Sequence, residues 1–311
     1  MLSLILNERR KLYKQKSTMI MVLLLSLIII GTGFFAKYDE NRRNVPEDWK
    51  EELLQENKES QEMMKDEKLP SSVKYQLQKD IDLNNYRIEN NQEPSAIWNF
   101  MNATVYLVEI ISIFAIIVAA GSISKEFSWG TIKLLMIRPV SRTKILLSKY
   151  LSTFVYVIEL LLLLFILSFL IGGILFGFDH INTSILTYSE GKVLEENPVL
   201  YILKSYGLNS ISLFIMTTFA FMISTLFRSS ALAIGLSITL TFVGSTIVGI
   251  FAKYEWVKYI LFTNVNLNQY IDGSQVLHGM TMKFSIIMLL IYYVMFILLT
   301  WIPFKKRDIA G

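Results

Sequence analysis

The chain of 311 residues is 53% hydrophobic and 18% charged, with a formal net charge of +4 at pH 7. A soluble domain is about 45–50% apolar and roughly 25% charged. Here the charges form clusters separated by long uncharged runs, which is typical of an integral membrane protein. Cysteine is absent, which excludes disulfides, thiolate catalysis and thiolate metal sites.

The N-terminal residues 1–17 predict an amphipathic helix before the first span. Apolar residues gather near one helical face and charged residues lie elsewhere: Leu2, Ile5, Leu6 and Leu12 against Glu8, Arg9, Lys11 and Lys16. Such a pattern is typical of a helix that lies in the interface of the inner leaflet. The alternative interpretation is a disordered basic anchor.

Six segments are long and apolar enough to cross a bilayer, which takes about 20 residues. The predicted spans are 18–36, 101–123, 146–178, 201–227, 231–252 and 284–304. The first follows basic residues, as the core of a secretory signal does, but its apolar run is too long and no convincing small-residue cleavage site follows. We therefore predict an all-α integral membrane protein with six transmembrane helices and an uncleaved first span.

Residues 37–100, between the first two spans, predict an extracellular helical hairpin. The segment holds ten basic and fifteen acidic residues. Apolar residues recur at helical spacing on both sides of a break at Leu69-Pro70: Trp49, Leu53, Met63 and Met64, then Val73, Leu77, Ile81 and Ile88. The hairpin is interpreted either as a contact for substrate or a partner, or as a solvated spacer or dimer contact.

Two shorter segments are predicted on the same outer side. Residues 179–200 are expected to form an outer loop. Residues 253–283 are amphipathic but too polar to cross the bilayer, and they predict an outer or re-entrant segment.

Lysine and arginine indicate the orientation, because cytoplasmic loops carry an excess of both. With six spans the two termini share a side, which carries five bases in 9–16, six in 125–149, Arg228 and three in the tail 305–311. The short loops opposite carry few bases. We therefore expect both termini to be cytoplasmic.

No enzyme signature is present in the sequence. It contains no H-E-x-x-H, no G-x-S-x-G and no G-x-x-x-x-G-K-[ST]. We expect no catalytic residue, no metal ligand, no cofactor bound by this chain and no nucleic-acid partner. If transport is driven by ATP, a partner chain must hydrolyse it.

Two carboxylates lie within predicted spans, Glu109 in the second and Glu159 in the third. A membrane carboxylate is costly and by default faces the bundle interior or a polar cavity. The neighbours of Glu159 are apolar, so its partner must be water or another helix; hydroxyls of the fourth and fifth spans are candidates, such as Thr217, Thr218, Ser237 and Thr239. We favour a structural or pathway role over a proton relay, because no intramembrane Lys or Arg accompanies the two acids.

The segment between the second and third spans predicts a helix, a break and a second helix. Residues 125–137 form a short amphipathic helix that ends before Pro139, and Ser141 caps a new helix that continues into the third span. The result is a rigid cytoplasmic knob, residues 124–145, joined to a membrane helix. A force on the knob would tilt the span.

This segment, KEFSWGTIKLLMIRPVSRTKILLSKYL, closely resembles the cytoplasmic segment of bacterial ABC-2 type transporter permeases, the membrane subunits of type-2 ABC exporters. The positions that match are Glu126, Gly130, Thr131, Leu134, Leu135, Pro139, Ser141, Arg142, Ile145, Leu146 and Lys149. The overall plan of spans and termini is similar too, except that 37–100 is longer than in compact family members. The motif says nothing about cargo.

The resemblance implies a permease of the bacterial cytoplasmic membrane that pairs with a second copy or a sister permease. Each permease would dock on a cytoplasmic ATPase, which binds ATP and Mg. Glu126 and the helix after it would seat in a cleft of that ATPase as a coupling helix, together with Phe127, Gly130, Thr131, Leu134, Leu135, Pro139, Ser141 and Arg142.

Three functions remain open from the sequence. The first is ATP-driven export of an antimicrobial peptide or amphipathic drug. The second is a non-transporting sensor or immunity protein that binds a toxic peptide through the outer hairpin. The third is an ion-coupled carrier that uses Glu109 and Glu159.

Overall fold

A computed structural model describes residues 1–42, 49–66, 69–136, 140–179, 181–189, 191–271, 277 and 279–306. Within them, six helical segments are long and apolar enough to cross a membrane, judged by length and composition. They are α2 (Lys16–Arg42), the continuous α5 (Ala96–Thr104), η1 (Val105–Leu107) and α6 (Val108–Ser128), α8 (Arg142–Phe176), α9 (Pro198–Phe227), α10 (Ser230–Phe251) and α12 (Met282–Lys306). The prediction of six apolar helices is confirmed.

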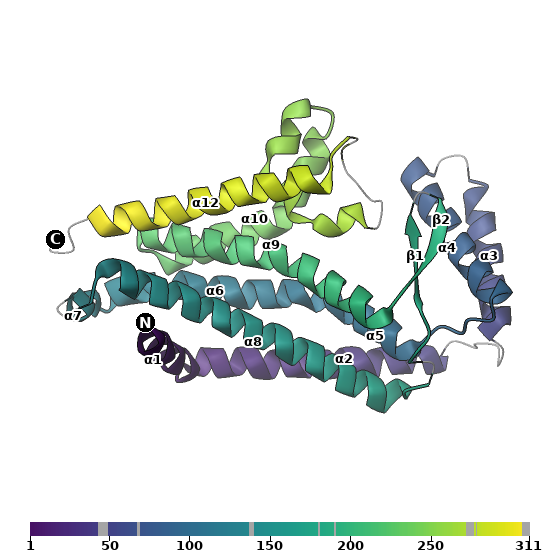
Figure 1. Cartoon of the computed structure of the whole chain (residues 1–311), viewed down its shortest axis with the longest axis horizontal. Coiled ribbons are helices and arrows are strands. Elements are labelled where there is room, and N and C mark those ends of the chain that lie inside the picture. Colours follow the sequence, from purple (N-terminus) through teal and green to yellow (C-terminus); the bar gives the residue numbers. More distant parts are fainter. Residues whose placement is uncertain are drawn as a thin grey trace.

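The long helices lie side by side along the long axis of the molecule (Figure 1). The N-terminal helix α1 (Leu2–Tyr13) and the end of α12 lie at one end, together with the short helix α7 (Ile132–Met136). We call this the terminal end. The opposite end carries α3 (Trp49–Met64), α4 (Ser71–Glu89) and a two-stranded sheet.

Three of the long helices begin at a side-chain cap that the sequence supplies. Ser141 accepts a hydrogen bond from the amide of Lys144 at the start of α8. Asn197 and Ser229 cap α9 and α10 in the same way. Such caps satisfy amide groups that a helix leaves unpaired in its first turn, so the caps fix where each long helix enters the bundle.

Two helices form the centre of the bundle. Of the most apolar stretch of α9, 67% is buried, and 56% of that of α5–α6, whereas the other four have 17–28% buried. One hydrophobic cluster joins α2, α5, α6 and α8 around Leu25, Met101 and Tyr156. A second joins α6, α9 and α12 around Phe221 and Phe296. The peripheral helices therefore present large apolar faces outward.

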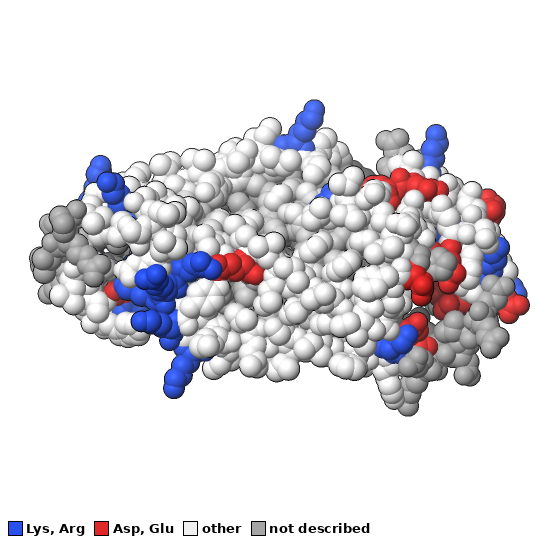
Figure 2. Space-filling view, turned by 60° about the horizontal axis from the view of Figure 1, so that its bottom comes forward, with Lys and Arg blue, Asp and Glu red and all other residues white. Residues whose placement is uncertain are grey.

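Charged side chains gather toward the two ends of the molecule. Figure 2 shows a cluster of Lys and Arg toward the terminal end and a mixture of acidic and basic side chains over the opposite end, with a broad, largely uncharged surface between them. Apolar side chains of the long helices, such as Phe35, Ile174 and Leu290, are exposed. A soluble monomer rarely exposes so much contiguous apolar area, whereas lipid accommodates it.

The domain at the opposite end differs from the expected helical hairpin. The helices α3 and α4 pack together, and hydrogen bonds join Asn57 to Asn84 and Asn85. Residues 179–200, expected to be a loop, instead contain strands β1 (Ile185–Ser189) and β2 (Lys192–Glu196), paired antiparallel with Ser189 opposite Lys192. Gly191 takes a positive φ of 77° beside this turn.

The β-hairpin packs against α4, which joins two segments far apart in the sequence into one domain. The Tyr188 hydroxyl donates to Asp82 at 2.7 Å, which raises the pKa of Tyr188 to about 12. The Tyr86 hydroxyl and the Gln92 amide both donate to Glu195. These donors hold the pKa of Glu195 below its usual value, Gln92 most strongly.

Residues 253–271 fold into three short turns, η2 (Glu255–Tyr259), α11 (Leu261–Val265) and η3 (Leu267–Tyr270). Asn264 ties them together, because its amide donates to the carbonyls of Lys258 and Ile260 and its oxygen accepts from Ser285 of α12. The rest of the predicted re-entrant segment includes 272–276 and 278, which lie outside the described residues.

Candidate functional site

The junction between α6 and α8 differs from the predicted short helix over 125–137. The helix α6 continues to Ser128, the backbone breaks at Trp129-Gly130, and α7 covers only Ile132–Met136. Gly130 has a φ of 68°, a left-handed conformation that glycine adopts without a steric penalty. Pro139 lies outside the described residues. The break therefore falls at the Trp-Gly pair, and Glu126 belongs to the last turn of α6.

A small hydrophobic core holds α7 against the beginning of α8. Ile132 and Leu135 of α7 are buried against Ile145 of α8, with Phe127 and Val140 beside them. The other face of the junction is open, since Trp129 is 69% and Leu134 is 66% exposed. The junction is thus a packed element with two large, exposed apolar side chains, and its helix α7 lies at the terminal end of the molecule (Figure 1).

Glu126 points into the molecule, contrary to the expectation that it contacts a partner. Its carboxylate pairs with Lys149 of α8 at 2.7 Å and with Lys11 of α1 at 3.6 Å, and it accepts a hydrogen bond from Thr131. Glu126 therefore links α1, α6 and α8 and fixes the turn that leads into α7.

Lys149 is the centre of this ion cluster. Its side chain is 3% exposed and its ammonium group donates to Glu126 at 2.7 Å and to Glu8 of α1 at 2.8 Å. A buried ammonium group is costly unless it is paired and hydrogen-bonded, so two carboxylates are needed to hold it. The ion pairs of Lys149 with Glu8 and Glu126 thereby hold α1 against α6 and α8.

Two further contacts tie the junction to the other side of the bundle. The Arg228 guanidinium, at the end of α9, stacks over the Phe127 ring with 4.5 Å to its centroid. Arg142 at the start of α8 donates to the carbonyl of Lys305 in α12, at 3.4 Å. The junction is consequently connected to α1, α9 and α12 as well as to its own two helices.

Glu159 has partners that the sequence did not suggest. Its carboxylate forms an ion pair with Arg9 and accepts a hydrogen bond from the Tyr13 hydroxyl, both in α1. Burial, and then Glu159, raise the pKa of Tyr13 to about 12. The expectation of partners in the fourth and fifth spans was wrong, because α1 lies against α8 and its long side chains reach further than a hydroxyl.

The hydroxyls of α9 that were candidates for Glu159 have other partners. Thr217 donates to the carbonyl of Leu213, four residues earlier, and Thr218 bonds the Tyr150 hydroxyl at 2.9 Å. Inside a helix, a Thr hydroxyl commonly donates a hydrogen bond to the carbonyl four residues earlier, as Thr217 does. Ser237 of α10 is buried without a partner among the described residues.

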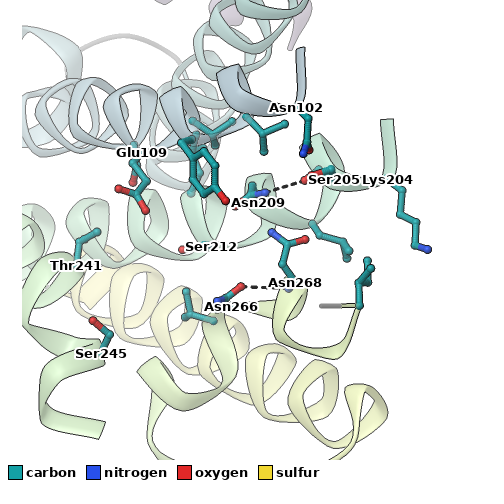
Figure 3. A pocket seen from close by; sticks show the side chains of 18 of the residues that line it. Asn102, Glu109, Lys204, Ser205, Asn209, Ser212, Thr241, Ser245, Asn266 and Asn268 are labelled. Carbon is teal, nitrogen blue, oxygen red and sulfur yellow. Dashed lines mark hydrogen bonds between the residues drawn. The ribbon is translucent and has the colours of Figure 1, made fainter. Parts of the chain in front are cut away.

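Glu109 lines a cavity of ≈ 500 Å³ in the half of the bundle away from the terminal end. The cavity lies between η1–α6, α9, α10, α11 and η3 (Figure 3). Asn102, Tyr106, Glu109 and Ser112 come from consecutive turns of α5–α6, so helical spacing places them on one face.

The helices opposite also contribute polar faces. On α9, Ser205, Asn209 and Ser212 recur every three or four residues, and Lys204 lies next to Ser205. On α10, Thr241 and Ser245 are four residues apart; they lie near Glu109 in Figure 3. Asn266 and Asn268 complete the lining from the η3 turn.

The sequence analysis did not predict the polar residues that line this cavity, although the sequence contains a signal for them in α9. Polar residues that recur at a spacing of three or four within an apolar helix predict a polar face, and α9 carries this pattern at Ser205, Asn209 and Ser212.

The described residues contain no group of three or more His, Asp or Glu side chains placed to hold a metal ion. The chain has no cysteine.

Comparison with known proteins gives a family and two relatives. The model of the family described as "Protein of unknown function (DUF2705)" matches residues 72–310. A Bacillus subtilis (strain 168) protein described as "Uncharacterized protein YhcI" is 41% identical over 317 residues, covering 100% of both chains. From the same organism, "Uncharacterized membrane protein YdbK" is 35% identical over 213 residues, 68% of this chain and 82% of the relative. Together with the six apolar helices, these findings indicate a multi-pass membrane protein.

Proposed function

This chain belongs to the DUF2705 family of proteins of unknown function, and we propose that it is the permease subunit of an ATP-driven bacterial exporter. A separate cytoplasmic ATPase supplies the energy and docks on the α6–α7–α8 junction. The chain itself is not an enzyme in this proposal. It lies in the cytoplasmic membrane with both termini inside, pairs with a second permease, and carries the α3–α4 domain outside.

The observation that carries the proposal is the form of the junction. Its outer face offers Trp129 and Leu134, both mostly exposed, while its inner face is packed on α8. Aromatic and large apolar anchors are the residues that contribute most to protein interfaces. An exposed Trp and Leu beyond the ends of the spans suit a partner protein better than water.

The contacts beneath the junction suit the transmission of force. Movement of α7 would reach α8 through Ile145, α1 through the Glu126–Lys149 cluster, and α9 through Arg228. An element that is packed and ion-paired on several sides moves as a unit, because close-packed interiors transmit strain. Glu126 has the role of a positioning residue here: it sets the direction in which α7 leaves α6.

The orientation and the place of α1 follow from charge. The Lys and Arg side chains gathered over the terminal end support a cytoplasmic position for that end. The contacts of α1 with Lys149 and Glu159 hold it across α8, which supports the proposal that α1 is an interfacial helix of the inner leaflet.

The ion-coupled carrier is less well supported than export. A relay carboxylate must gain and lose a proton, whereas Glu159 is held by Arg9 and Tyr13. Glu109 has no such partner among the described residues, but one carboxylate does not make a relay.

Affinity purification of the full chain from its native membrane tests the proposal. We expect a P-loop ATPase to co-purify with the unaltered chain and to be lost with Trp129→Ala and Leu134→Glu. The matched control is Trp256→Ala, which removes an exposed Trp at the opposite end. Failure to recover an ATPase, or its recovery with both junction variants, would contradict the proposal.

A further inference from the structure

We propose that the cavity lined by Glu109 binds the cationic headgroup of an amphipathic organic molecule, with Glu109 as its counter-ion. The inference rests on the proposed export function only in treating that molecule as cargo. The binding itself follows from the charge, hydrogen-bonding groups and size of the cavity, which belong to this chain alone.

The charge in the cavity is negative and unpaired. Among the residues that the structure describes, none forms a hydrogen bond or ion pair with Glu109. Lys204, the other charged residue in the lining, pairs with Glu196 of β2 at 3.5 Å, and its side chain points away from Glu109 (Figure 3). A carboxylate in a membrane protein is costly unless it meets an opposite charge or water. A bound cation supplies that charge.

Hydrogen-bond acceptors lie on the walls around this carboxylate. Ser112 is one turn along the helix from Glu109, is 5% exposed, and its hydroxyl has no partner among the described residues. Buried polar groups are usually paired, so this hydroxyl is a vacant partner for a ligand. Ser212 and Ser245 line the cavity from two other helices. An ammonium group has three donors to satisfy, and the cavity offers acceptors on several sides.

The remainder of the lining is apolar, including Val105, Leu213, Phe262 and Val265. Gly244 lets α10 approach closely here, because a Cβ at this position would lie 2.3 Å from the Phe262 ring. The volume of ≈ 500 Å³ lies within the range of about 300–1,000 Å³ for small-molecule sites. Polar groups and apolar walls together suit a molecule with one charged and one apolar part.

Other classes of ligand fit less well. A hard cation such as Ca²⁺ takes six to eight oxygen ligands, usually with several carboxylates, and this cavity has one. An anion would be repelled by the carboxylate of Glu109. A neutral apolar molecule would leave Glu109 and Ser112 unpaired. An organic ammonium or guanidinium group is the class that satisfies all of these groups.

The test uses the purified full chain in nanodiscs of phosphatidylcholine, without ATPase or ATP. The probe is dansylcadaverine, a fluorescent aromatic primary amine, and its N-acetyl derivative is the neutral control. We expect saturable binding of the amine and at least tenfold weaker binding of the acetylated compound. Glu109→Gln should weaken amine binding at least tenfold, and Ser112→Ala should weaken it by a smaller factor.

The matched control is Glu159→Gln, which removes a carboxylate that points to α1 and should leave probe binding unchanged. Thermal unfolding of each variant checks that it is folded, and Glu109→Asp supplies a second variant that keeps the charge and should retain binding. Equal binding by folded Glu109→Gln, equal binding of the neutral compound, or no saturable binding would overturn the inference. Because no ATPase is present, these outcomes are independent of the purification experiment above.

Discussion

At the scale of single residues, Lys149 determines how the charged cluster at the terminal end behaves. Its ammonium group is held by Glu8 and Glu126. Either acid alone still compensates the charge, whereas the loss of both leaves a buried, unpaired ammonium group. Removal of every partner of a buried ion costs roughly 3–5 kcal/mol.

We therefore predict non-additive stability. Glu8→Gln and Glu126→Gln should each lower the free energy of unfolding by about 0.5–1.5 kcal/mol, and the double variant should lose more than the sum. Thermal unfolding of the purified chain measures all three. Lys149→Met combined with both Gln changes should recover part of the loss, because it removes the unpaired charge. Additive losses would mean that Lys149 is solvated rather than held by the two acids.

Glu159 gives a second prediction at this scale. Arg9 is 42% and Glu159 25% exposed in their side chains, so this pair should contribute only about 0.2–1 kcal/mol. A double-mutant cycle with Arg9→Gln and Glu159→Gln should yield a coupling energy of that size, and export should largely persist. A folded Glu159→Gln protein that no longer exports would instead indicate a proton relay.

Residue-scale partners were the least predictable part of the molecule. The sequence identified Glu109 and Glu159 as notable because a carboxylate in an apolar run is rare. It did not indicate that Arg9 and Tyr13 reach Glu159. That contact depends on where α1 lies across α8, which is tertiary geometry that no local pattern encodes.

At the scale of elements, the break at Gly130 controls how α7 leaves α6. A Cβ at Gly130 would meet no described atom within 4 Å, so the obstacle to substitution is its φ of 68°. Gly130→Ala should therefore cost about 1 kcal/mol through backbone strain and weaken the co-purification of ATPase. Gly31→Ala is the control, since Gly31 is inside α2 with equally open space and no positive φ; it should be neutral or slightly stabilising. Equal effects of the two changes would show that the backbone conformation at 130 is unimportant.

The β-hairpin gives an element-scale prediction with a pH dependence. Hydrogen bonds from Gln92, and then from Ser184 and Tyr86, lower the pKa of Glu195 below its ordinary 4.5. A lowered native pKa contributes stability that is present above about pH 4.5 and is lost as the pH falls through the native value.

Amide hydrogen exchange in the β-hairpin should accordingly be slow at pH 6 and faster, after correction for the intrinsic rate, below pH 4. Glu195→Gln should remove this difference, because an amide does not titrate in that range. Protection that is the same at both pH values in the unaltered chain would show that Glu195 does not hold the hairpin on α4.

The elements themselves were predictable where a strong local signal existed. Long apolar runs identified the six helices, and Ser141 marked the start of α8. The β-hairpin was missed because two five-residue strands beside a long hydrophobic segment have little periodicity of their own, and α4 rather than local pattern stabilises them. The short helix predicted over 125–137 is instead divided by the break at Trp129-Gly130, so that its first residues belong to α6 and α7 begins at Ile132.

At the scale of the whole molecule, the two candidate sites lie in different halves of the bundle and share two helices. α6 carries Glu109 near its beginning and Glu126 near its end, and α9 carries Asn209 and ends at Arg228. Both helices are the most buried in the bundle. A shift of the junction would therefore move the walls of the cavity, which gives an exporter a physical route from the ATPase to the cargo.

This route requires that the two ends face opposite sides of the membrane, and the absence of cysteine makes the orientation directly testable. Lys58→Cys lies in α3 and Lys144→Cys near the start of α8. In intact cells a membrane-impermeant maleimide should label the first and not the second, and permeabilised cells should label both. Both lysine side chains are exposed, so both variants should fold. Labelling of Lys144→Cys in intact cells would invert the topology, place the junction outside, and remove the access of a cytoplasmic ATPase on which the proposed function depends.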